Sequence, residues 1–306
     1  MRYFYLIIFI CFLACNKSME KEKEPYIVIL GTAQDAGYPQ ANCNKNCCTN
    51  AWENPQNTKY VSCIALVDPV SKQQWLIDAT PDIKKQIQLL NNETKIENLN
   101  GVLLTHAHIG HYTGLMYFGR EALATKALPV FTMPKMKKFL EKNGPWSQLV
   151  DLNNIKINVL KSNSTFNLND NIEITPFSVP HRNEFSETIG FKIVINNKSL
   201  IFIPDIDKWE KWQIDICELI QNIDYAFLDG TFYKNGELKI DMSEIPHPFV
   251  EESMNLFSKL SLKDKKKIYF THLNHTNPLL INNSRAQKEV FKNGFNIAIE
   301  GQRIEF

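Results

Sequence analysis

The stretch from Thr105 to Gly114 reads THAHIGHYTG, and it constrains the fold strongly because metal ligands must meet at one point. It carries His106, His108 and His111, and the preceding run NGVLL predicts a strand that leads into them. On an extended segment, alternate side chains point to the same side, so His106 and His108 can hold one ion. His111, which follows a turn, can reach a second position. The stretch therefore predicts a metal site at the end of a strand.

The remaining four histidines of the chain reinforce this interpretation. They are His181, His247, His272 and His275, and almost every histidine follows a predicted strand beside Pro, Asp or another His. If the seven histidines had unrelated structural roles, it would be rare for nearly all of them to lie at the ends of predicted strands. Asp205 ends the strand SLIFIPD and could bridge two ions with its two oxygens. Imidazole suits zinc, iron and other first-row metals, and a metal-bound water could attack an ester or phosphodiester near neutral pH.

Secondary structure predicted along the chain is mixed, with polar residues at strand ends. Short apolar runs bounded by turn formers predict strands, and 3.6-residue spacing predicts helices. Strands are expected at 25–31, 61–69, 74–80, 100–108, 128–134, 157–161, 164–168, 172–181, 188–196, 199–205, 225–233, 266–275 and 295–306. Helices are expected at 81–92, 114–125, 135–143, 211–222 and 247–260, and residues 32–50 are expected to form a long loop. Two facing sheets flanked by helices would accommodate this pattern.

Composition bounds the class of protein. The 306 residues are 44% hydrophobic and 22% charged, as in ordinary folded domains. The net charge of +1 gives no electrostatic case for a nucleic acid or an acidic partner. No shift in composition marks a boundary between residues 25 and 306, so one domain is expected there.

The N-terminus predicts export. The apolar run from Tyr3 to Ala14 is shorter than the ~20 residues of a membrane-spanning helix, and it resembles a secretory signal. A small residue followed by Cys15 resembles a bacterial lipoprotein cleavage site, although Phe12 departs from the usual aliphatic residue. We therefore predict a signal peptide at 1–15, a polar tether at 16–24, and a lipid anchor that holds the protein in the cell envelope, on the periplasmic side or at the outer membrane. A simple signal peptide and an uncleaved anchor are the alternatives.

The cysteines of the segment CNKNCC, which are Cys43, Cys47 and Cys48, allow two interpretations. An exported protein could oxidise two of them to a disulfide. Three clustered thiols would then leave one unpaired, so a metal cluster is at least as good an interpretation. Cys63 and Cys217 lie in apolar contexts and are expected to be inert core thiols.

The order THAHIGH, His181, Asp205 and His272 resembles the metallo-β-lactamase superfamily, whose signature is H-x-H-x-D-H followed by a later His, a bridging Asp and a final His. The resemblance spans nearly the whole chain after the N-terminal segment. It implies an α+β fold, the αββα four-layer sandwich, with the metals at one edge of the two sheets.

A narrower resemblance is carried by LGTAQDAGYPQANC, FLDGTFY, IPHP and THLNHTNPLL, which look like the branch of pyrroloquinoline-quinone biosynthesis protein B. The cyclic phosphodiesterase of phosphonate breakdown is a neighbouring relative with a structural zinc on a cysteine cluster and a late histidine. This implies a closed structural zinc site made of Cys43, Cys47, Cys48 and His275. The disulfide interpretation, with His275 as a loop histidine, remains open.

Two catalytic metal positions are implied by the resemblance. The first would use His106, His108, His181 and Asp205. The second would use an Asp at position 110, His111, Asp205 and His272, but residue 110 is glycine. Either the second ion is weak or absent, or another carboxylate replaces the missing one. Asp35, in GTAQDAG, is our candidate as ligand or proton-transfer group, and the alternative is that it caps a turn.

Four further residues receive roles from the resemblance. Asp229 and His247 come from segments that the branch places near the pocket, and they are expected to bind substrate, support the ligands or act as general acid. Asp207 is expected to be structural, and Asp78 is expected to orient a loop beneath the metals.

The function expected is a metal-dependent hydrolase that acts on a phosphodiester or other ester of small-molecule size through a metal-bound hydroxide. One or two catalytic Zn²⁺ ions are expected, with Fe or Mn as alternatives. An iron-dependent oxygenase or hydroxylase is the second hypothesis. That branch is expected to alter the first histidines of the H-x-H motif, and because this chain keeps them, hydrolysis is favoured. A non-catalytic binding lipoprotein is the third hypothesis.

Overall fold

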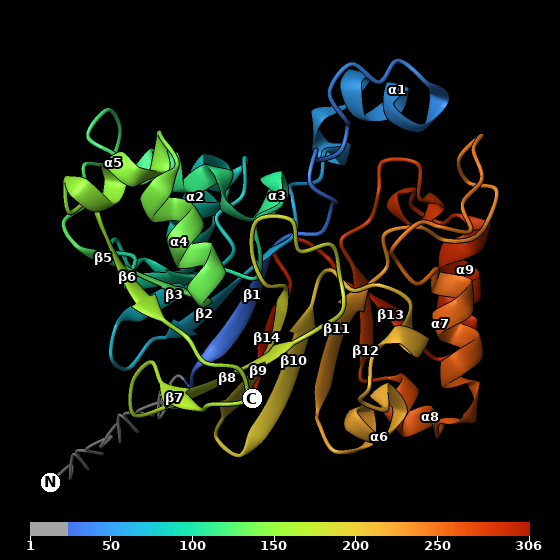
Figure 1. Ribbon diagram of the computed structural model, residues 1–306. Helices are drawn as coiled ribbons and strands as arrows, with labels where there is room; N and C mark the ends of the chain where they lie inside the picture. Colours follow the sequence, from blue (N-terminus) through green and yellow to red (C-terminus); the bar gives the residue numbers. More distant parts are fainter. Residues whose placement is uncertain (1–23) are drawn as a thin grey trace, which may run out of the picture.

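The fold is a four-layer αββα sandwich, which confirms the expectation from the resemblance. The computed structural model describes residues 24–306, in which two seven-stranded sheets pack face to face and helices cover the outer face of each sheet (Figure 1). The predicted signal peptide and most of the predicted tether lie outside the described residues. Among residues 24–306, no helix combines the length and apolar character needed to cross a bilayer.

The two sheets divide the chain almost in half. The first has the order β14-β1-β2-β3-β4-β5-β6, and the second has the order β13-β12-β11-β10-β9-β8-β7. The first is built from β1 (Tyr26–Gly31), β2 (Cys63–Asp68), β3 (Gln73–Ile77), β4 (Gly101–Leu103), β5 (Leu128–Thr132), β6 (Ile155–Val159) and β14 (Arg303–Glu305). The second is built from β7 (Phe166–Asn167), β8 (Ile172–Ser178), β9 (Ile189–Ile195), β10 (Lys198–Ile203), β11 (Tyr225–Asp229), β12 (Ile268–Thr271) and β13 (Asn296–Ile297).

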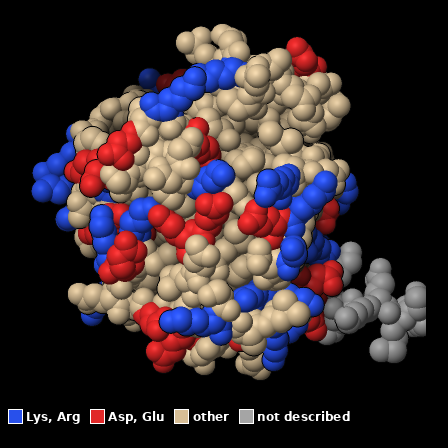
Figure 2. Space-filling view, turned by 90° about the vertical axis from the view of Figure 1, so that its right-hand side faces the viewer, with Lys and Arg blue, Asp and Glu red and all other residues tan. Residues whose placement is uncertain are grey.

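Helices line both outer faces (Figure 1). The first sheet is covered by α2 (Ile83–Thr94), α4 (Pro134–Lys142) and α5 (Trp146–Asp151), and the second by α6 (Ile216–Gln221), α7 (Val250–Leu256), α8 (Leu262–Lys265) and α9 (Arg285–Lys292). The short helix α1 (Asn46–Glu53) stands apart above the sandwich. On the face that carries α7, α8 and α9, positive and negative side chains are interspersed (Figure 2), which matches the near-zero net charge.

Strand β1 shows how the sequence builds the layers. Ile27 and Ile29 belong to the apolar cluster between the two sheets, together with residues of β8, β9 and β10. Val28 and Leu30 belong to the cluster between the first sheet and its helices. Because successive side chains of a strand point to opposite faces, a strand buried on both sides reads as an unbroken apolar run, as YIVILG does.

Strand direction places the candidate ligands. Strands β3 to β6 run parallel, as do β10 to β13. The carboxyl ends of parallel strands meet at one edge of a sheet, and in this chain the polar residues that follow β3, β4, β10, β11 and β12 gather there. Catalytic groups on other parallel sheets lie at the same kind of edge.

Two local expectations were wrong, and one helix was not predicted. The predicted helix 114–125 is instead α3 (Ile109–Tyr112) followed by a 3-10 helix at Thr113–Phe118, because Gly119 turns to an extended conformation and the chain leaves the helical path. The expected loop 32–50 contains the start of α1, which the poor helix formers Asn and Cys concealed. Helix α9 had not been predicted, although its first turn is signalled by Ser284, whose hydroxyl accepts from the backbone N–H of Gln287.

Candidate metal centre

Asp205, directly after β10, lies at the centre of the candidate site. Its Oδ2 is 2.9 Å from Nε2 of His111, 3.1 Å from Nε2 of His272 and 3.7 Å from Nε2 of His106. Its Oδ1 is 3.6 Å from Nε2 of His181. Oδ2 thus lies nearest His111 and His272, with His106 on the same side, and Oδ1 lies nearest His181. A carboxylate that is surrounded in this way by imidazoles could be shared by two ions.

The first group consists of His106, His108 and His181. Their ligand atoms lie within 4.8 Å of one another, and Nε2 of His106 is 2.9 Å from Nδ1 of His108. Burial lowers the pKa of all three histidines, and it lowers the pKa of His181 to about 4. At neutral pH these imidazoles are therefore uncharged, which is the form that binds a metal ion.

The second group consists of Asp35, His111 and His272. Their ligand atoms also lie within 4.8 Å of one another, and Oδ1 of Asp35 is 3.3 Å from Nε2 of His111. Burial lowers the pKa of His111, but Asp78, Asp205 and Asp35 outweigh it and leave the pKa well above its usual value. The surrounding carboxylates thus favour a positive charge at this position, which a metal ion would supply.

Asp78 and Thr105 orient the histidines of the first sheet. Nδ1 of His111 donates to Oδ2 of Asp78 at 2.7 Å. The Thr105 hydroxyl donates to Asp78 and accepts from Nδ1 of His106 at 3.0 Å. With Nδ1 engaged, both imidazoles present Nε2 to the centre, as metal-bound histidines usually require. The expected position of Asp78 beneath the metals agrees with this geometry.

Asp229 and Thr231 play the same part in the second sheet. Nδ1 of His247 donates to Oδ2 of Asp229 at 2.7 Å, and Nδ1 of His272 donates to the Thr231 hydroxyl at 2.9 Å. Thr231 in turn donates to Oδ1 of Asp229 at 2.7 Å. Nδ1 of His247 is also 3.7 Å from Oδ1 of Asp205, so His247 borders the centre.

Buried atoms at this centre test whether a metal would fit. Five side chains of this centre, Asp205 among them, carry buried polar atoms that have no hydrogen-bond partner. A buried polar group without a partner costs free energy. These atoms are Oδ1 of Asp35, Nε2 of His111, Nδ1 and Nε2 of His181, Oδ2 of Asp205 and Nε2 of His272. All of them are metal-ligand types, and Nε2 of His111, His181 and His272 lie 2.9–3.6 Å from an oxygen of Asp205. The residues present therefore fit divalent metal ions.

The cysteine cluster forms a second candidate metal site, separate from the centre around Asp205. The ligand atoms of Cys43, Cys47, Cys48 and His275 lie within 4.8 Å of one another. Sγ of Cys43 is 3.7 Å from Sγ of Cys47, and all three thiols are free. Two thiolates about 2.3 Å from a tetrahedral zinc ion lie about 3.8 Å apart, so this spacing matches zinc. A disulfide would require about 2.05 Å.

Several residues of the centre were not foreseen from the sequence. Thr105 and Thr231 stand inside the quoted motifs, yet only the structure shows their hydrogen bonds to the histidines. Ser186 accepts from the backbone N–H of Ala107 and so ties the loop after His181 to the H-x-H segment. Asp207, expected to be structural, pairs with Lys211 at 3.0 Å and belongs to none of the ligand groups. Cys63 is buried, as expected, whereas Cys217 is only partly buried.

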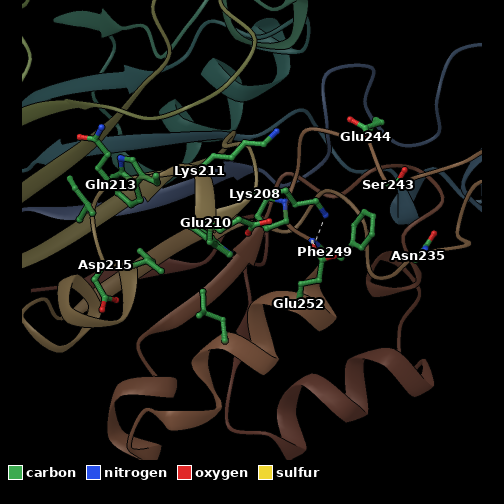
Figure 3. A pocket seen from close by; sticks show the side chains of 16 residues that line it. Lys208, Glu210, Lys211, Gln213, Asp215, Asn235, Ser243, Glu244, Phe249 and Glu252 are labelled. Carbon is green, nitrogen blue, oxygen red and sulfur yellow. Dashed lines mark hydrogen bonds and ion pairs between the residues drawn. The ribbon is translucent and has the colours of Figure 1, made fainter.

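A groove of about 990 Å³ lies between the segment that follows Asp205 and the segment that follows His247 (Figure 3). Nζ of Lys208 lies 3.7 Å from the centre of the Phe249 ring and 2.6 Å from Oε2 of Glu252. Because Glu252 neutralises this lysine, Lys208 does not present a free positive charge to the groove.

The fold and the centre define the class of protein. The profile of the beta-lactamase superfamily domain matches residues 73–273, and the chain belongs to the beta-lactamase superfamily, with the metallo-beta-lactamase fold. This confirms the resemblance drawn from the sequence.

Within that class the chain is similar to coenzyme PQQ synthesis protein B. The protein of Acinetobacter baumannii (strain ACICU) is 26% identical over 92% of this chain and 99% of the relative, and that of Methylorubrum extorquens (strain PA1) is 25% identical over the same shares. The crystal structure of Zn²⁺-bound PqqB from Methylobacterium extorquens covers 92% of this chain and 100% of its own at a TM-score of 0.77 and 24% identity. A diphosphatase of the PhnP family covers 92% and 97% at a TM-score of 0.66 and 20% identity.

Proposed function

We propose that the protein is a metal-dependent hydrolase of a phosphodiester or another ester of small-molecule size. The observation that carries this proposal is the convergence of two ligand groups on the buried carboxylate of Asp205, one made of His106, His108 and His181 and the other of Asp35, His111 and His272. A bridging carboxylate between two imidazole groups is a common arrangement for activating water and stabilising an oxyanion.

Different residues of the chain would bind the metal, orient its ligands and transfer a proton. Bound zinc, or iron or manganese in its place, would supply an activated water and an electrophile for the developing negative charge. Asp78 and Thr105 hold His106 and His111 in one tautomer and orientation. His247 is hydrogen-bonded to Asp229 through Nδ1 and borders Asp205, which supports a role for His247 as the proton donor to the leaving group.

The test of this function uses bis(p-nitrophenyl) phosphate with the metal-loaded protein. His106→Ala should abolish hydrolysis while the circular dichroism spectrum stays that of the wild type. Asp207→Ala, a change outside the ligand groups, serves as the matched control and should retain activity. Full activity of a clean His106→Ala preparation would refute the hydrolase.

An iron-dependent oxygenase is the competing activity, because curated relatives named for coenzyme PQQ synthesis align with 92% of the chain. Elemental analysis of protein from the native host, combined with measurement of oxygen uptake, separates the two. Stoichiometric iron and oxygen consumption would favour the oxygenase, and zinc with diester hydrolysis would favour the hydrolase.

The cysteine cluster supports a structural zinc site in this proposal. A Cys3His set leaves no open coordination position, so its role would be to fix the segment of α1 rather than to catalyse. We expect that removal of the zinc ion with a chelator also unfolds the segment of α1.

Export and lipid attachment form a separate part of the proposal. The sequence around Cys15 supports a cell-envelope location with a lipid anchor. Mass spectrometry of the mature N-terminal peptide tests it, with Cys15→Ser as the control. An unmodified N-terminus in the wild type would refute the anchor.

A further inference from the structure

Gly110 and Asp35 compete for the same space at the centre. A Cβ atom at position 110 would lie 2.2 Å from Oδ1 of Asp35 and 2.6 Å from Cα of Asp35. Contacts this short with a backbone atom cannot be relieved by turning a side chain. Any side chain at position 110 therefore excludes Asp35 from its present position, and the two are alternatives.

The Asp35 carboxylate points at the second imidazole group. Its Oδ1 is 3.3 Å from Nε2 of His111, and it shares a ligand cluster with His111 and His272. Oδ1 of Asp35 is buried, and the polar group that it faces is the His111 imidazole rather than a backbone N–H of its own turn. The carboxylate therefore does not cap its own turn, which removes the main structural reason for an aspartate at this position.

The loop that carries Asp35 is attached to the segment that carries His272. The backbone N–H of Gln34 donates to the carbonyl of Leu273 at 2.9 Å, and the N–H of Leu273 donates to the carbonyl of Thr32 at 2.7 Å. Leu273 follows His272 directly in the chain. These hydrogen bonds fix the Asp35 backbone relative to a residue of the same ligand cluster, as a ligand requires.

We propose that Asp35 is the terminal carboxylate ligand of the second metal ion, and that residue 110 is glycine because Asp35 occupies the space of its side chain. The ligand has moved from the histidine motif to the loop after β1, while the donor set keeps two histidines, one terminal carboxylate and the bridging Asp205. This inference rests on the proposed metal centre, but it does not depend on which reaction the centre performs.

Metal binding, rather than activity, tests the proposal. Protein stripped with EDTA is titrated with Co²⁺, and bound ions are counted by elemental analysis after gel filtration. Cobalt bound to the cysteine cluster is recognised by its thiolate charge-transfer absorption, so that ion is counted separately. Asp35→Asn, which keeps the size of the side chain, should hold one ion fewer per chain than the wild type or bind that ion at least ~100-fold more weakly, since even supporting residues around a metal cost 10–100-fold.

A second variant probes the shared space. Gly110→Asp alone should not improve binding, because Asp35 is still in place and its Cα would lie 2.6 Å from the new Cβ. Thermal unfolding identifies any variant that fails to fold, and Asp35→Asn then remains as the readout. Equal ion number and affinity in Asp35→Asn and the wild type would overturn the proposal, and so would a wild type that holds a single ion at the centre. A variant that loses diester hydrolysis but keeps the ion count of the wild type would bear on the proposed hydrolase activity and not on the identity of the ligand.

Discussion

Oδ2 of Asp78 lies 2.7 Å from Nδ1 of His111, and both side chains are completely buried. Asp78 also accepts from the backbone N–H and the hydroxyl of Thr105, so three donors fix its position. The arrangement makes Nδ1 the protonated nitrogen of His111 and leaves Nε2 free to bind a metal ion.

We expect Asp78→Asn to weaken the ion bound through His111 by about 10–100-fold, because the amide cannot accept from all three donors. Competition between the protein and a chromophoric chelator measures the affinity. Asp207→Asn is the matched control, since Asp207 pairs with the largely exposed Lys211 and should leave the affinity unchanged. An Asp78→Asn affinity equal to that of the control would show that Asp78 does not support the ligand.

We expect Gly110→Ala to destabilise the fold by about 1–3 kcal/mol, because the new methyl group overlaps Asp35. Urea unfolding of the metal-free protein measures the free energy. Gly144→Ala is the control, since a Cβ there meets nothing within 4 Å. In an Asp35→Gly background only part of this cost should disappear, because the contact with Oδ1 is removed while the contact with Cα of residue 35 remains. A cost that is not reduced at all would show that the Asp35 side chain does not contribute to the overlap.

We expect Cys47→Ser to release the zinc ion of the cysteine cluster and to loosen the segment around α1 while the sandwich stays intact. The reason is that an ion shared by the three thiols and His275 would tie the segment around α1 to the segment that follows β12. The apolar packing of Cys48 and Ala51 alone would then hold the segment less firmly. Hydrogen exchange measured by mass spectrometry should rise in residues 41–57. Cys217→Ser, which lies outside the cluster, should leave exchange there unchanged, and a similar profile for both variants would argue against a structural zinc.

We expect the free energy of unfolding to depend on pH through Glu300, independently of any bound metal. Burial raises the pKa of the Glu300 carboxyl to about 7, against the pull of Lys59 and of the backbone N–H of Tyr60. Between pH 4.5 and 7 the folded protein therefore binds more protons than the unfolded chain, and this group's contribution to stability falls as pH rises through that window.

We expect Glu300→Gln to remove this penalty, because the amide can accept from Tyr60 without carrying a charge. Relative to the wild type, the variant should gain about 2 to 4 kcal/mol between pH 4.5 and 8, since one pKa unit corresponds to 1.36 kcal/mol. Urea unfolding at each pH, in the same metal-free buffer, measures the difference. A difference that stays constant with pH would show that the pKa of Glu300 is the same in the folded and the unfolded protein.

Much of the architecture could be read from local patterns. The run YIVILG predicted a strand, and its two buried faces agree with the absence of alternation in the run. The helix expected at 81–92 is present as α2 at Ile83–Thr94. The helix expected at 114–125 is only a 3-10 helix at Thr113–Phe118, because the chain becomes extended at Gly119.

The sequence by itself determined the types of ligand, their order along the chain and their places at strand ends, because these follow from side-chain chemistry and from the periods of strands and helices. Only the tertiary structure decided which ligands share an ion, which threonines and carboxylates orient the imidazoles, and that Asp35 fills the space beside Gly110. Those relationships join residues far apart in the chain. They depend on how two sheets bring their strand ends together, and side-chain periodicity carries no information about contacts at that range.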